Sequence, residues 1–140
     1  MSRFKTSLAI AVFLGQFVSS AGNVCAQAPR ALRDRIPKAD PHKYDSVREA
    51  HDWKNPYLIV RPDGVEMVGI TGARQTIAVE SVPAALEKLP VSAWPYGLVV
   101  AVQDVGIVGG ATDETRIKAN RAQLLKLLKE LDVTVDPWPS

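Results

Sequence analysis

The stretch Leu98-Val99-Val100-Ala101-Val102 is the most apolar run after residue 28, and it decides the fold. Three of its five residues are valine, a β-branched residue that packs well in strands. Polar and apolar positions do not alternate along it, which is typical of a strand covered on both faces. We therefore predict a strand that begins at Leu98, continues toward Val108 and forms the centre of a sheet.

Upstream of this run the chain carries a hairpin signal. Residues 57–60 form a strand-like apolar run, residues 61–64 supply the Pro, Asp and Gly of a tight turn, and residues 65–70 return with partial alternation. After a second turn, residues 75–79 can form a third short strand. The sequence therefore predicts a hairpin and one further strand before the central run.

Helical patterns flank the central strand. Ser81 is expected to cap a helix over residues 82–89. Thr112 or Asp113 is expected to cap a longer helix over about residues 113–131. Apolar residues at helical spacing form one stripe of this longer helix, and charged residues lie on its other side. The stripe consists of Ile117, Leu124, Leu128 and Leu131.

The order of elements ends with a strand over residues 133–135. Helices that connect strands need room to cross over, so two helices between strands favour a layered arrangement. We predict an α/β (α+β) fold, a small mixed sheet of about four or five strands with two main helices packed on one face. Residues 55–140 form this single domain.

Residues 29–54 are rich in proline and charge, so we expect a linker there. Asp40-Pro41 has the pattern of a helix start, with Asp as the cap and Pro at the first helical position. A short helix with a weak apolar stripe can run from there through residue 52.

Residues 1–28 have the organisation of a cleavable signal peptide for secretion. Arg3 and Lys5 form a basic start, residues 8–14 are apolar, and Ala26-Gln27-Ala28 is the small-x-small pattern that a signal peptidase requires. Cleavage after Ala28 would export the protein to the periplasm or the extracellular space.

Two alternatives for this segment stay open. A retained membrane anchor needs about 20 predominantly apolar residues, whereas Gln16 and the small and polar residues 19–23 shorten the run here. Lipidation of Cys25 requires a small residue immediately before the cysteine, and Val24 stands there instead. We therefore expect no stable membrane span unless the signal is retained.

Removal of the signal changes the charge of the chain. The full sequence has 17 Lys and Arg against 15 Asp and Glu, and the signal takes Arg3 and Lys5 with it, which leaves 15 of each sign. The remaining chain has a formal charge of zero and lacks the basic surface that nucleic acids require. We therefore expect no nucleic-acid partner.

The signal also carries the one cysteine of the chain, Cys25. After cleavage no disulfide, thiol nucleophile or cysteine metal site can form. His42 and His51 are nine residues apart, which places them on opposite sides of one helix, so we expect them to share no metal ion. No catalytic residue, metal or cofactor is predicted.

Gly109, Gly110 and Thr112 lie between the central strand and the long helix, where the free N–H groups of a helix start can hold a phosphate. They are our candidate phosphate-binding residues. Their spacing matches neither a Walker loop nor a dinucleotide fingerprint. The alternative is that the glycines only turn the chain between strand and helix.

The tryptophans of the chain stand near prolines at the ends of predicted elements. Trp94, Tyr96 and Trp138 are candidate ligand-binding residues, because proline-stiffened loops can present flat aromatic faces to sugars or extended peptides at low entropic cost. The alternative is that the tryptophans cover the rims of a small core.

Residues 57–65, the helix end at residues 86–89, and the helix and strand over residues 124–135 resemble in their order the periplasmic domain of the ExbD/TolR family. The resemblance covers about residues 55–136. It implies this fold and a tendency to dimerise or to bind periplasmic partners. That family uses an aspartate within a transmembrane helix, and residues 6–28 contain no acidic residue, so its proton-coupled role is not carried over.

These observations favour an uncharacterised exported protein that acts as a non-enzymatic binding or interaction module. The expected partners are an envelope protein, a cell-wall component or a second copy of the chain. The alternatives are a small-molecule or phosphate-binding domain and a hydrolase with an unrecognised site. The hydrolase is disfavoured because no Gly-x-Ser-x-Gly motif occurs.

Overall fold

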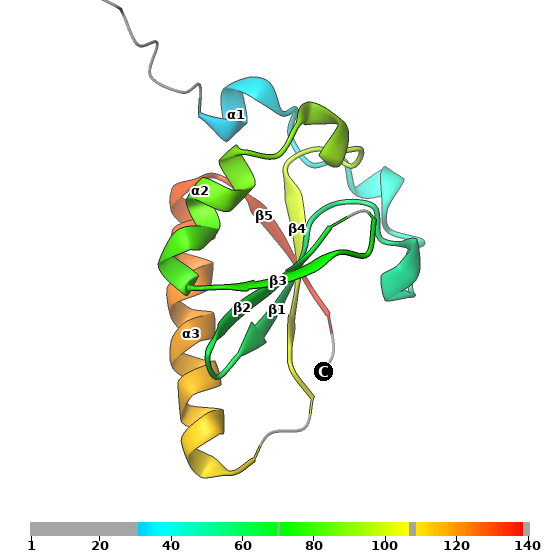
Figure 1. Ribbon diagram of the computed structural model, residues 1–140. Coiled ribbons are helices and arrows are strands. Elements are labelled where there is room, and N and C mark those ends of the chain that lie inside the picture. Colours follow the sequence, from blue (N-terminus) through cyan, green and yellow to red (C-terminus); the bar gives the residue numbers. More distant parts are fainter. Residues whose placement is uncertain (1–30, 70, 107–108, 139–140) are drawn as a thin grey trace, which may run out of the picture.

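A five-stranded mixed sheet forms the centre of the molecule (Figure 1). The computed structural model describes residues 31–69, 71–106 and 109–138, so the signal predicted over residues 1–28, with Cys25, lies outside the described residues. The strands are β1 (Tyr57–Arg61), β2 (Gly64–Val68), β3 (Arg74–Ile77), β4 (Val99–Asp104) and β5 (Thr134–Pro137). Their order is β3-β2-β1-β4-β5; β1, β4 and β5 run parallel, and β2 is antiparallel to both of its neighbours.

Strand β4 is the predicted valine-rich strand, and it is covered on both faces. It lies between β1 and β5, so the middle position of the sheet belongs to β1 and not, as predicted, to β4. β4 ends at Asp104, and residues 107–108 of its predicted continuation lie outside the described residues. Its fully buried side chains alternate between the two core clusters, with Val100 and Val102 in one and Val99 and Ala101 in the other.

Helices α2 (Val82–Glu87) and α3 (Ala111–Glu130) cover one face of the sheet (Figure 1). The predicted fold class, a small mixed sheet with two main helices on one face, is therefore confirmed. Most of the apolar stripe predicted for the long helix is buried as well. Ile117, Leu124 and Leu128 are buried, whereas Leu131, which follows the last residue of α3, is half-buried.

The cap predicted for the long helix is wrong. Gly110, rather than Thr112 or Asp113, caps α3, because its positive φ of 141° lets the chain turn directly into the helix. Ser81 stands at the predicted N-cap position of α2, but its side chain makes no capping hydrogen bond, since a short 3-10 turn, η3 (Val79–Ser81), already leads into the helix.

Residues 31–39 form a segment that we term the strap. It begins with the short helix α1 (Leu32–Arg35) and continues as extended chain. Leu32 and Ile36 are at most 2% exposed and belong to the core on the helix side of the sheet. The first part of the linker expected over residues 29–54 is thus packed into the domain, because two apolar residues at helical spacing anchor it.

The helix predicted from Asp40-Pro41 through residue 52 is wrong beyond its first turn. Asp40 accepts a hydrogen bond from the N–H of His42 (3.2 Å), as expected of a cap, but only the 3-10 turn η1 (Pro41–Lys43) follows. A second 3-10 turn, η2 (Ala50–Asp52), comes later. A continuous helix with a weak apolar stripe would bury little apolar surface. The observed path instead packs the rings of Tyr44 and Trp53 against the sheet, which buries more.

Five aromatic side chains, which we term the aromatic layer, cover the face of the sheet opposite the helices. Neighbouring rings meet edge to face or tilted, with centroids 5.1 to 5.8 Å apart. They come from the segment before β1, from β1 itself, from the loop before β4 and from the end of β5. The layer consists of Tyr44, Trp53, Tyr57, Tyr96 and Trp138.

Asn55 precedes β1, and its side chain binds the loop that precedes β4. Its amide nitrogen donates to the carbonyl oxygens of Gly97 (2.7 Å) and Val99 (2.8 Å), and its amide oxygen accepts from the N–H of Tyr96 (2.9 Å). The residue is 3% exposed. Because buried polar groups without partners are costly, this one side chain fixes the path of the chain into β4.

We expect Asn55→Ala to lower the free energy of unfolding by about 2–4 kcal/mol, since it takes the acceptor from the buried N–H of Tyr96 and one donor from each of two carbonyl oxygens. Urea unfolding followed by tryptophan fluorescence measures the change. Gln75→Ala, on the exposed strand β3, is the control and should shift stability by less than about 0.5 kcal/mol. A loss below about 1 kcal/mol for Asn55→Ala would contradict the role given to this side chain.

Two glycines with similar backbone angles test the packing of the strap. Gly97 has φ 83° and Gly72 has φ 77°, angles that cost alanine about 1–2 kcal/mol. A Cβ at Gly97 would overlap the carbonyl oxygen of Lys38, whereas a Cβ at Gly72 would meet open space. We expect Gly97→Ala to cost at least about 2 kcal/mol more than Gly72→Ala in urea unfolding. Equal losses would mean that the strap does not press against this loop.

Candidate functional site

Trp94 and Tyr96 lie inside the domain. Trp94 follows the short turn η4 (Val91–Ala93), belongs to the core on the helix side and is 3% exposed. Tyr96 belongs to the aromatic layer, and its hydroxyl donates to the carbonyl oxygen of Asp52 (3.2 Å). Neither residue presents a flat face to solvent, so the exposed presentation on which their candidacy as ligand-binding residues depended is not found.

Trp138 follows β5 and completes the aromatic layer. Its ring centroid lies 5.7 Å from that of Trp53 and 5.8 Å from that of Tyr57, and its indole N–H donates to the carboxylate of Asp136 (2.8 Å). The packing of the three tryptophans agrees with the alternative interpretation, in which they cover the sides of a small core.

The phosphate-binding candidates Gly109, Gly110 and Thr112 lie at the start of α3. The N–H of Gly109 already donates to the carboxylate of Asp113 (3.3 Å), and two acidic residues occupy the first turn of the helix. Their negative charge repels an anion at this place. Residues 107–108 of the turn lie outside the described residues. The geometry agrees with the alternative that the glycines turn the chain.

The two histidines lie on different turns, His42 on η1 and His51 on η2, and both are exposed. The imidazole of His51 lies 3.4 Å from the carboxylate of Asp52. Within residues 31–69, 71–106 and 109–138, no three His, Cys, Asp or Glu side chains gather closely enough to hold a metal ion.

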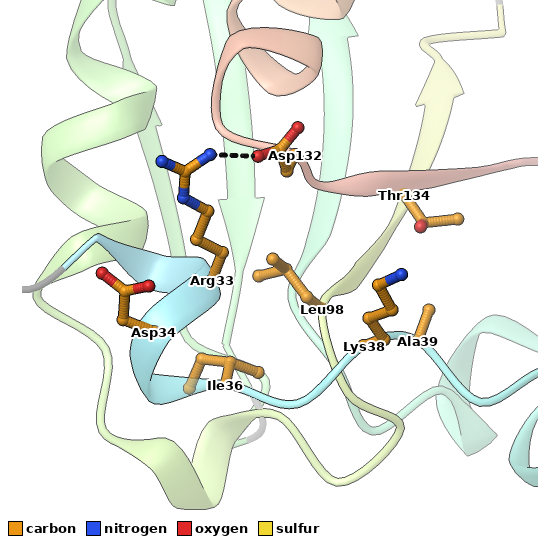
Figure 2. Close-up of a pocket in the computed structure, with 8 residues that line it drawn as sticks. All are labelled: Arg33, Asp34, Ile36, Lys38, Ala39, Leu98, Asp132 and Thr134. Atoms are coloured by element: carbon orange, nitrogen blue, oxygen red, sulfur yellow. Dashed lines mark hydrogen bonds and ion pairs between the residues drawn. The ribbon is translucent and has the colours of Figure 1, made fainter.

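A cavity of about 710 Å³ lies between the strap and the start of β5 (Figure 2), and we term it the strap cavity. Its volume is within the range of about 300–1,000 Å³ that is common for small-molecule sites. The strap forms one wall, β5 and the turn before it form the other, and the residue before β4 lies between them. The lining residues are Arg33, Asp34, Ile36, Lys38, Ala39, Leu98, Asp132 and Thr134.

Leu98 holds the two walls of the strap cavity in place. Its N–H donates to the carbonyl oxygen of Pro37 (2.8 Å), and its own carbonyl oxygen accepts from the N–H of Thr134 (3.0 Å). The strap pairs in parallel with this residue through a bridge between Lys38 and Leu98. Asp132, with a left-handed φ of 57°, turns the chain from α3 toward β5. The cavity is thus built on backbone hydrogen bonds of the sheet.

The two ends of the strap cavity carry different charges. At one end Arg33 forms an ion pair with Asp132 (2.8 Å), whose hydrogen bond and charge, together with the charge of Asp34, raise the pKa of the guanidinium. At the other end Figure 2 shows Lys38 and Thr134. The ammonium of Lys38 has no ion pair or hydrogen bond with any described residue. This end therefore carries an uncompensated positive charge beside a hydroxyl group.

A second polar cluster lies on the sheet beside the aromatic layer. Glu66 of β2 is 6% exposed, and its carboxylate binds the guanidinium groups of Arg61 (2.7 Å) and Arg74 (3.0 Å). The hydroxyl of Tyr57 donates to the side-chain oxygen of Gln103. Two cations offset the burial of one carboxylate, so this cluster is well compensated.

Sequence reasoning missed the strap cavity, because Lys38 and Thr134 belong to opposite ends of the described chain and meet only through the sheet. The one signal that could have pointed to it is the spacing of Leu32 and Ile36, which marks the strap as a packed segment. The cluster around Glu66 was missed as well, because its two arginine partners follow from strand register rather than from spacing in the sequence.

Comparisons of this chain with protein families, curated proteins and solved structures found no match. The resemblance to the ExbD/TolR periplasmic domain stays a prediction from the order of elements. The candidate site therefore rests on the geometry of the residues described above.

The stability of the domain is expected to fall at alkaline pH through Tyr57. Burial raises the pKa of Tyr57 above its ordinary value of 10.0, although the charge of Arg74 acts in the opposite direction. Above about pH 10 the unfolded chain loses this proton first, so the contribution of Tyr57 is complete below that pH and is lost as the pH rises toward the folded pKa. Urea unfolding at about pH 9 and about pH 11 should show a smaller loss for Tyr57→Phe than for the unchanged protein. An equal loss in both proteins would contradict this assignment.

Proposed function

We propose that this protein is an exported, non-catalytic binding module that holds a small organic anion in the strap cavity. The observation that carries the proposal is the unpaired ammonium of Lys38, which lies at one end of a cavity of about 710 Å³ together with the hydroxyl of Thr134. A cation and a hydroxyl donor at a partly apolar cavity are the groups that a carboxylate or a phosphate needs.

The distribution of charge favours one anionic group at one end of the ligand. Arg33 is already bound to Asp132, so this pair closes its end of the cavity without offering a free charge. Figure 2 places Asp34 away from Lys38, at the end of the cavity where Arg33 lies. An anion beside Lys38 is therefore attracted by the nearest charge, and the body of the ligand can lie along Ile36 and Leu98.

The lining of the strap cavity supports binding rather than chemistry. The residues that line it include no imidazole and no thiol, and neither of the two lining carboxylates, those of Asp34 and Asp132, forms a hydrogen bond with the hydroxyl of Thr134. A general base within hydrogen-bond distance of a nucleophile is the minimum that hydroxyl-based catalysis requires.

The compartment of this module is a proposal that rests on residues 1–28, whose basic start, apolar run and Ala26-Gln27-Ala28 pattern support export. No helix among the described residues is long and apolar enough to cross a membrane. An envelope protein, a cell-wall component and a second copy of the chain stay predicted partners, supported by the order of elements that resembles the ExbD/TolR domain.

Benzoate is a suitable probe because it joins one carboxylate to an apolar ring. We expect it to shift the backbone amide NMR signals of Leu98 and Thr134 in a saturable way. Lys38→Met should weaken this binding about fivefold, the effect of an exposed ion pair of about 1 kcal/mol. Benzamide, which lacks the charge, should bind the unchanged protein more weakly by a similar factor, and inorganic phosphate tests the charge without the ring.

Lys43→Met is the matched control, because Lys43 is an exposed lysine of η1 that does not line the cavity. It should leave benzoate binding unchanged. Equal affinities for benzoate and benzamide, or no effect of Lys38→Met on the Leu98 and Thr134 signals, would overturn the proposal.

A further inference from the structure

A second hollow is lined by residues of η2 and by residues that follow β2, namely Gly69, Thr71 and Gly72. It consists of an outer cavity of about 430 Å³ and an inner cavity of about 260 Å³. The two cavities share several lining residues, and we term them together the η2 groove. The residues that line both cavities are Ala50, His51, Tyr57, Val68 and Gly72.

The outer cavity is lined by one charge of each sign. Glu49 lies just before η2, and Arg74 belongs to β3. The carboxylate of Glu49 has no ion-pair partner among the described residues. Arg74 binds Glu66 through one nitrogen, and its side chain remains 66% exposed, so the other nitrogens of the guanidinium are free to donate.

The inner cavity is lined by both apolar and polar groups. Trp53 and Tyr57 of the aromatic layer and Val68 of β2 supply its apolar surface. Asn55 also lines it, but its amide is fully engaged with the loop before β4. The side chains of His51 and Thr71 supply further polar groups, so this end of the groove offers an apolar side chain a contact surface beside polar neighbours.

We propose that the η2 groove binds a zwitterionic α-amino acid with an apolar side chain. The carboxylate of the ligand pairs with the guanidinium of Arg74, and its ammonium group pairs with the carboxylate of Glu49. The apolar side chain enters the inner cavity beside Trp53. Charge-assisted hydrogen bonds at both ends of the ligand select a molecule that carries both charges.

This site is separate from the strap cavity, since the two share no lining residue. A negative result for the organic anion proposed at Lys38 would therefore leave this proposal unaffected. It also differs in chemistry, because the η2 groove offers a free carboxylate and a guanidinium where the strap cavity offers a single ammonium.

The test uses the full exported chain after removal of the signal and three related probes. L-Leucine carries both charges, N-acetyl-L-leucine lacks the ammonium, and L-leucinamide lacks the carboxylate. Binding is followed by calorimetry and by tryptophan fluorescence, to which Trp53 contributes. We expect L-leucine to bind at least about tenfold more tightly than either blocked probe.

Two variants identify which residue of the groove recognises which charge of the ligand. Glu49→Gln should weaken L-leucine binding and abolish the preference of the protein for L-leucine over N-acetyl-L-leucine, while the preference over L-leucinamide remains. Arg74→Gln should do the reverse, and the stability of this variant is checked by urea unfolding because Arg74 also binds Glu66. Glu114→Gln, an exposed acid on α3, is the matched control and should change neither preference.

The outcomes separate the two sites. Lys38→Met should leave L-leucine binding unchanged, even if it weakens the binding of benzoate. Equal affinity for L-leucine and its two blocked analogues in the unchanged protein, or no saturable binding of L-leucine, would overturn the proposal whatever the behaviour of the variants.

Discussion

The amide of Asn55 is the constraint on which the rest of the structure depends. It forms hydrogen bonds with backbone groups of residues 96, 97 and 99, where the chain enters β4. Other backbone groups of the same stretch then bind the N-terminal segment. The N–H of Asp40 donates to the carbonyl oxygen of Tyr96 (2.9 Å), and the carbonyl oxygen of Pro37 accepts from Leu98. One buried side chain therefore sets the positions of the strap, β4 and, through Leu98, the start of β5.

The N-terminal segment completes the core because a partly parallel sheet needs cover on both faces. Two helices cover one face, and the chain has no third long helix in the described residues to cover the other. The segment solves this by contributing to both sides. Leu32 and Ile36 join the core beside the helices, while Tyr44 and Trp53 supply two rings of the aromatic layer. Aromatic rings are effective here because each buries a large apolar area from a short length of chain.

The sequence predicted the parts of the fold that depend on local pattern. The valine-rich run, the hairpin around Asp63-Gly64 and the stripe of α3 follow from periodicity and turn chemistry, and each is present. The segment before Tyr57 was harder to predict, because its fold is decided by contacts with distant residues. Its proline and charge content is typical of linkers, yet it is held in place by buried side chains, which include those of Leu32, Ile36, Tyr44, Trp53 and Asn55. Both candidate sites use this segment as a wall, so neither was predictable from spacing alone.

The charged side chains at the two candidate sites are not the ones that stabilise the fold. Glu66 is buried, and loss of its arginine partners would leave an uncompensated carboxylate in the sheet. Lys38 and Glu49 are exposed and have no ion-pair partner among the described residues, and isolated surface charges contribute little to stability. Each nevertheless stands at the wall of a cavity, where a bound ion would be partly shielded from water and would interact with it more strongly than in solution. The chain that would remain after the proposed removal of residues 1–28 has no net charge, so long-range attraction of ligands would be weak and recognition would come from local charges of this kind.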